Sequence, residues 1–97
     1  MLVALERFDL KIPGCSSLKQ KRHVVKSLTN ALRSTFNVSV AEVGHQDLWQ
    51  RTTIAVAAVG EQEYHVRRMA GELQRFVEAW GTVELLHAEL TLHDPDD

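Results

Sequence analysis

The order in which strand and helix patterns follow one another is what most constrains the fold of this chain. Strand patterns, either alternating or continuously apolar, cover residues 2–12, 36–44, 51–60 and 82–93. A period of 3.6 residues, typical of amphipathic helices, covers residues 18–36 and 63–80. The predicted order is therefore βαββαβ, without repeats or linkers.

This order favours an α+β fold of the ferredoxin-like type, because right-handed crossovers then give a four-stranded antiparallel sheet with both helices on one face. The alternation of apolar and polar residues in the strands agrees with this fold, because the helices cover only one face of the sheet. The 97 residues suffice for one core. We expect residues 1–93 to form a single domain and residues 94–97 an acidic C-terminal tail. The side chains expected to point inward from the last strand are Leu86, Ala88, Leu90 and Leu92.

Composition excludes several classes of protein. Hydrophobic residues at 44% and charged residues at 25% are ordinary globular values. No apolar run approaches the ~20 residues of a membrane span, and Glu6, Arg7 and Asp9 interrupt the start, where a signal peptide would be apolar. The single cysteine, Cys15, excludes an intramolecular disulfide, and the histidines lack zinc-binding spacing. We expect a cytoplasmic protein with no membrane partner, metal or cofactor.

Charge is segregated along the sequence. Residues 10–41 hold six basic residues and no acid, whereas residues 42–97 hold eleven acids and four arginines. Five of the cations fall in the first helix: Lys19, Lys21, Arg22, Lys26 and Arg33. Those in its first turns face the partial positive charge of the helix N-terminus, which Ser17 and Gln20 are spaced to cap. The pattern predicts an anionic ligand, and its alternative is a solvated helix face.

Lys21 departs from the helical pattern, because its angular position lies in the middle of the apolar arc. We expect its aliphatic stem to cross the edge of the core and its ammonium group to emerge beyond the helix end. An ammonium group that returned to Asp47 or Asp9 would instead indicate a structural role.

The loop between the second and third strands contains more functional side chains than a connection requires. In the predicted fold it lies at the same end of the sheet as the start of the first helix and the turn at Gly81. The loop residues expected to shape a site are His45, Gln46, Trp49 and Arg51. In the alternative, Leu48 and Trp49 cap the core, while Asp47 bonds the turn or pairs with Arg51.

Three segments carry a resemblance to a known family: "LKIPGCSSLKQKR", "FNVSVAEVG" and "HQDLWQR". They resemble the YlxP-like family of small bacterial proteins, a domain of unknown function. Gln20 stands where that family usually has an acid, which leaves the basic turn less neutralised. The resemblance implies a ferredoxin-like fold and genes near those for transcription, translation initiation and ribosome maturation. It supplies no catalytic residues.

Three functions compete. The favoured one is a non-catalytic module that binds RNA or a ribosomal particle. Its predicted nucleic-acid or anion-binding residues are Lys19, Lys21, Arg22, Lys26, Arg33, His45, Gln46, Trp49 and Arg51. The second is a homodimeric protein-interaction module that pairs through the open sheet face, where we expect Val3, Leu5, Ala55, Ala57 and Leu85.

The third and weakest hypothesis is a small hydrolase of phosphoesters or acylphosphates. Acylphosphatases share the predicted topology, and Cys15 precedes a helix whose dipole could activate a thiol. A cysteine-phosphatase loop, however, has arginine six residues after the cysteine, and that position is Lys21. Cys15 also suits a small packed turn residue, and no catalytic residue is assigned.

Overall fold

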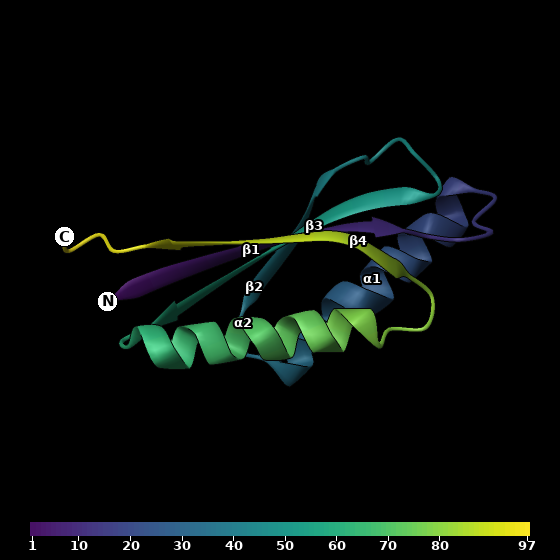
Figure 1. Ribbon diagram of the computed structural model, residues 1–97. Helices are drawn as coiled ribbons and strands as arrows, with labels where there is room; N and C mark the ends of the chain where they lie inside the picture. The colour runs from purple at the N-terminus through teal and green to yellow at the C-terminus, as the bar shows by residue number, and fades with distance from the viewer.

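The computed structural model describes residues 1–97 and has the predicted order of elements. These are β1 (Leu2–Lys11), α1 (Leu18–Thr35), β2 (Ser39–Gly44), β3 (Arg51–Gly60), α2 (Glu63–Glu78) and β4 (Glu84–His93). The strands lie in the order β2-β3-β1-β4, and every neighbouring pair is antiparallel. Both helices cover the same face of the sheet (Figure 1). The ferredoxin-like α+β prediction is confirmed.

The start of α1 is fixed by the predicted capping residues. Ser17 is the N-cap, and its hydroxyl accepts a hydrogen bond from the backbone N–H of Gln20 at 3.1 Å. The Gln20 side chain reaches back and accepts from the N–H of Ser16 at 3.0 Å. These bonds satisfy two donors at the helix entrance, so α1 begins at Leu18 as expected.

The core lies between the sheet and the two helices. Its buried cluster joins residues of every element except β4: Phe8, Leu10, Leu28, Leu32, Val40, Ile54, Val56, Leu73 and Val77. Side chains of β4, at one edge of the sheet, pack only partly against this cluster. The other face of the sheet has no covering element (Figure 1).

The predicted inward set of β4 is wrong at one position. Leu86 is exposed, and Leu85, which we expected on the open sheet face, packs against the core instead. The cause is a register shift, since Asp9 pairs with His87 but Leu10 pairs with Leu85. This irregularity places an extra residue in β4 and reverses the alternation of the residues before it.

Three connections meet at one end of the sheet, as predicted, and both termini lie at the other end (Figure 1). The β1–α1 turn and the β2–β3 loop are joined directly by Gln50. Its carbonyl accepts from the N–H of Ile12 at 2.9 Å, and its side-chain amide donates to the carbonyl of Cys15 at 3.3 Å. Neither helix combines the length and the apolar composition that a transmembrane helix requires.

Glu6 places a carboxyl group on the covered face of β1, and the residue is only 4% exposed. It pairs across the sheet with Val56 and Leu90, and its Oε1 atom has no hydrogen-bond partner. Burial penalises the charged form and raises the pKa of Glu6 from 4.5 to about 7. The fold therefore favours the protonated carboxyl.

This raised pKa predicts a pH-dependent stability. Below pH 4.5 Glu6 is protonated in both the folded and the unfolded chain, and the free energy of unfolding is at its highest. As the pH rises to about 7, the carboxyl ionises in the unfolded chain but resists ionisation in the fold, so the free energy of unfolding falls. The loss should be on the order of 3 kcal/mol, and Glu6→Gln should remove most of it. Urea denaturation across this pH range measures it, with exposed Glu89→Gln as the control. Parallel pH profiles for wild type and Glu6→Gln would contradict the assignment.

Candidate nucleic-acid interface

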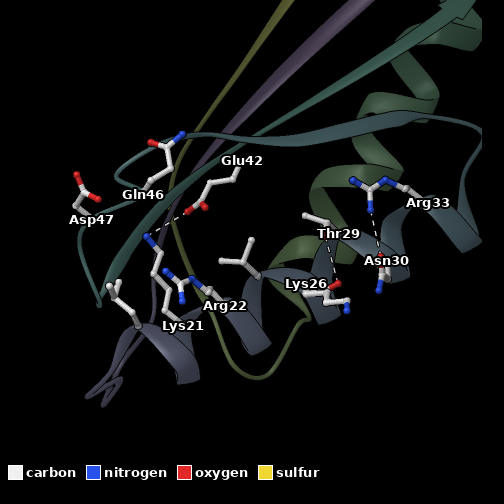
Figure 2. A pocket seen from close by; sticks show the side chains of 11 residues that line it. Lys21, Arg22, Lys26, Thr29, Asn30, Arg33, Glu42, Gln46 and Asp47 are labelled. Carbon is white, nitrogen blue, oxygen red and sulfur yellow. Dashed lines mark hydrogen bonds and ion pairs between the residues drawn. The ribbon is translucent and has the colours of Figure 1, made fainter.

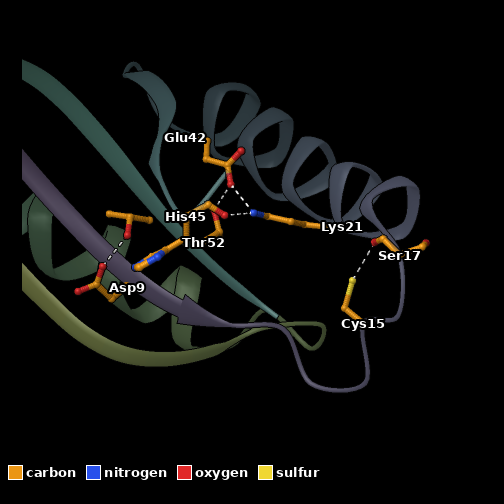
Figure 3. Close-up of polar contacts among 8 residues, drawn as sticks. Asp9, Cys15, Ser17, Lys21, Glu42, His45 and Thr52 are labelled. Atoms are coloured by element: carbon orange, nitrogen blue, oxygen red, sulfur yellow. Dashed lines mark hydrogen bonds and ion pairs between the residues drawn. The ribbon is translucent and has the colours of Figure 1, made fainter. Parts of the chain in front are cut away.

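Lys21 is buried, with 2% of its surface exposed. Its Nζ atom forms an ion pair with Oε2 of Glu42 at 3.2 Å and donates a hydrogen bond to the carbonyl of His45 (Figure 3). The ammonium group therefore does not emerge beyond the helix end. It pairs with neither Asp47 nor Asp9, the two acids considered from the sequence. Asp9 instead accepts a hydrogen bond from the Thr53 hydroxyl at 2.7 Å. Its neutralising partner is Glu42 of β2.

Glu42 ties three elements together. Its Oε2 atom accepts from the Thr52 hydroxyl of β3 at 2.5 Å as well as from Lys21 of α1. The Glu42 side chain is 21% exposed, so the pair lies at the edge of the core. A buried lysine requires such a partner, because an uncompensated charge there costs several kcal/mol.

The same interaction fixes the β2–β3 loop. The backbone of His45 has a φ of 61°, a left-handed conformation that histidine adopts more readily than most residues. Its carbonyl accepts from Lys21 and also from the N–H of Leu48 at 3.1 Å. The loop is thereby held against the first turns of α1.

A groove of about 580 Å³ runs between α1 and the β2–β3 side of the molecule (Figure 2), and we call it the α1 groove. Arg22, Lys26 and Arg33 line it from the helix. Glu42, Gln46 and Asp47 line it from β2 and the loop. Its other lining residues are Leu18, Lys21, Val25, Thr29 and Asn30. One wall is thus cationic, and the facing wall carries hydrogen-bond acceptors.

The cations of α1 differ in how far they are engaged within the protein. Arg33 donates to the carbonyl of Val40 at 2.7 Å and to Asn30 at 3.2 Å. Lys19, Arg22 and Lys26, which we call the basic face, are exposed, and none has a carboxylate within 4 Å. They also make no side-chain hydrogen bond, so their charges remain available to a ligand.

The loop presents a second hollow, of about 370 Å³, beside the α1 groove. It is lined by Asp47, Leu48, Trp49, Gln50 and Arg51. Leu48 and Trp49 are each about half exposed, at 49% and 48%, so they do not cap the core. Asp47 pairs with no residue, and the buried Nε of Arg51 has no partner.

The structure brings most of the predicted site residues into two neighbouring hollows, one along α1 and one at the β2–β3 loop. Those lining the α1 groove are Lys21, Arg22, Lys26, Arg33 and Gln46, and those in the second hollow are Trp49 and Arg51. Asp47 lines both. Lys19 and His45 line neither, although Lys19 belongs to the basic face.

Cys15 lies buried in the β1–α1 turn, away from both hollows. Its thiol donates to the carbonyl of Ser17 at 3.5 Å, and its own carbonyl accepts from Gln50. These contacts are those of a packed turn residue.

Sequence reasoning missed Glu42 and did not assign Asp47 to the site. A signal for Glu42 was present, because Val38, Val40 and Glu42 share one side of the alternating strand. An acid that faces inward and a lysine in an apolar arc form a natural pair. No comparable signal marks the groove residues Thr29 and Asn30, because neither departs from the amphipathic pattern of the helix.

Comparison with known proteins identifies the family. Residues 3–90 match the sequence model of the family described as "Protein of unknown function (DUF503)". The chain belongs to this family. It is also 35% identical over 83 residues to "Uncharacterized protein YlxP" of Bacillus subtilis (strain 168), a match that covers 86% of this chain and 90% of that protein. The resemblance to the YlxP-like family is confirmed.

Solved structures share the fold at low sequence identity. The designed protein Foldit4 aligns with a TM-score of 0.53 and 10% identity, covering 97% of this chain and 98% of its own. At3g17210 of Arabidopsis thaliana aligns with a TM-score of 0.50 and 15% identity, covering 96% and 94%. At these identities the likeness concerns the fold alone.

The Lys21–Glu42 pair predicts a characteristic pattern of mutant stability. Lys21→Met leaves the Glu42 carboxylate without its cation and should cost about 3 kcal/mol of unfolding free energy. Lys21→Met/Glu42→Leu removes both charges and should recover most of this loss, as measured by urea denaturation. Lys26→Met, at an exposed position of the same helix, should change stability by less than about 0.5 kcal/mol. A Lys21→Met protein as stable as Lys26→Met would contradict the assignment.

Proposed function

We propose that this protein is a non-catalytic module that binds RNA through the basic face of α1 and the β2–β3 loop. The observation that carries the proposal is the basic face itself, three exposed cations without an acidic partner. Lys19, Arg22 and Lys26 lie at spacings of three and four residues, so they share one side of the helix. They span about 10 Å along it, and one segment of a polynucleotide backbone can contact all three.

The distribution of ion pairs supports this proposal. On α2, Arg67 pairs with Glu63 at 3.7 Å and Arg68 with Glu72 at 3.5 Å. Helix α1 has no acid in its first turn, and its exposed cations have no such neutralisation. Unpaired cations on one side create a local positive field, although the chain carries a net charge of −2. Phosphate groups are the ligands that such a field attracts.

The loop supports RNA as the polyanion. The exposed Trp49 offers a surface on which an unpaired base can stack, and sequence-specific RNA recognition uses such unstacked bases. The open sheet face lacks Phe, Tyr and Trp side chains, so the proposed surface lies on the helical side instead. The gene neighbourhood implied by the family resemblance agrees with ribosomal RNA or a ribosomal particle as the partner.

Fluorescence anisotropy with labelled single-stranded RNA tests the proposal. Three phosphate contacts predict that affinity falls roughly twentyfold between about 50 and 200 mM salt. Arg22→Glu/Lys26→Glu should weaken binding at least tenfold. The matched control is Arg67→Glu/Arg68→Glu, which makes the same charge change on α2 and should stay within about threefold of wild type. Salt-independent binding, or equal losses in both variants, would refute the proposal.

A second candidate function is homodimerisation through the open sheet face. The observation that favours it is the exposure of Leu5 at 44%, Val59 at 68% and Leu86 at 45%. Large exposed apolar side chains on one sheet face suit a self-complementary interface. Such a dimer is compatible with RNA binding, because the helices lie on the opposite face.

Sedimentation velocity at micromolar concentration measures this association. We expect a dimer for the wild-type protein and a monomer for Leu5→Glu, because a carboxylate at the centre of the interface would be buried without a partner. Tyr64→Glu, at an exposed position of α2, should leave the dimer intact. A wild-type protein that sediments only as a monomer would exclude this candidate.

A further inference from the structure

We infer that the α1 groove binds one unpaired nucleotide and prefers guanine, with the phosphate at Arg22 and Lys26 and the base edge at Asp47 and Glu42. The inference rests on the proposed RNA binding and deepens it by naming the preferred base. It starts from the two unlike walls of the groove. A surface that binds only phosphate gains nothing from carboxylates beside its cations, since these repel the ligand.

The carboxylates of the loop-side wall keep oxygens that no donor of the protein occupies. Oε2 of Glu42 accepts from Lys21 and Thr52, whereas its Oε1 has no hydrogen-bond partner within the protein. Asp47 is exposed and has no partner at all, and both side chains line the groove. The wall thus offers carboxylate oxygens that accept hydrogen bonds and cannot donate them.

Guanine is the base whose edge best fits such acceptors. Its N1–H and its exocyclic amino group are adjacent donors that a single carboxylate accepts in a bidentate arrangement. Adenine, cytosine and uracil have no such pair of adjacent donors on this edge, so an acceptor stands where guanine has its second donor. That acceptor would face a carboxylate oxygen unpaired, which penalises these bases.

The groove has the size and walls for one nucleotide. Its volume of about 580 Å³ lies in the range of small-ligand sites, and Leu18 and Val25 supply apolar surface for a base. A base can enter only when it has left a stack, so the ligand is single-stranded. Lys21 holds Glu42 and the carbonyl of His45, which precedes the acceptor residues of the loop (Figure 3). The Glu42 part of the acceptor wall and the backbone of the loop are therefore preorganised.

The experiment compares uridine heptamers that carry guanosine, adenosine or inosine at the centre. The wild-type protein should bind the guanosine heptamer about tenfold more tightly than the adenosine heptamer. Inosine, which lacks the exocyclic amino group, should be intermediate. Asp47→Asn should abolish the preference, because the amide keeps only one acceptor oxygen for guanine and gains a donor for the acceptor of adenine, so that the adenosine heptamer binds at least as tightly as it does to the wild-type protein. The control Glu89→Gln, on the open sheet face, should keep the preference.

The outcomes separate the inference from the proposal beneath it. Equal, salt-dependent binding of the three heptamers would overturn the guanine preference and leave RNA binding standing. A preference that survives in Asp47→Asn would overturn the assignment of the base edge to Asp47. Absence of binding to every heptamer would overturn both.

Discussion

The buried ion pair between Lys21 and Glu42 determines the arrangement of the end of the molecule where α1 begins. It joins α1 to β2 and, through Thr52, to β3, and the same ammonium group holds the carbonyl of His45. Removing either charge would strand the other in a largely buried position. The loop conformation is therefore coupled to the packing of α1 on the sheet.

This interaction also divides the basic residues of α1 into two roles. The ammonium group of Lys21 is buried and paired with Glu42, whereas Arg22 and Lys26 keep exposed charges that no acid neutralises. Because Lys21 holds Glu42 and the carbonyl of His45, the Glu42 carboxylate and the backbone of the loop are fixed in place across the groove from these cations. If RNA binds as proposed, it would lose little affinity to ordering of this part of the protein.

The fold could be predicted from the sequence because its two periodicities are regular and its helix start carries a capping signal. The sequence did not predict that Leu85 rather than Leu86 faces the core, because a β-bulge depends on strand pairing and leaves no mark in a single sequence. Lys21 was visible as an exception within an apolar arc. Its partner was not identified, because finding Glu42 requires both the register of β2 and the placement of α1 above it. The basic face was predictable, since helical spacing alone aligns its charges.

The measurement that tests the central claim most directly is a titration of the ¹⁵N-labelled protein with single-stranded RNA, followed by amide chemical shifts. The account predicts salt-sensitive shifts that concentrate in residues 18–33 and 45–51, the stretch of α1 beside the groove and the loop that Lys21 anchors. Shifts confined to the open face of β1, β3 and β4, or no shifts at low salt, would contradict it.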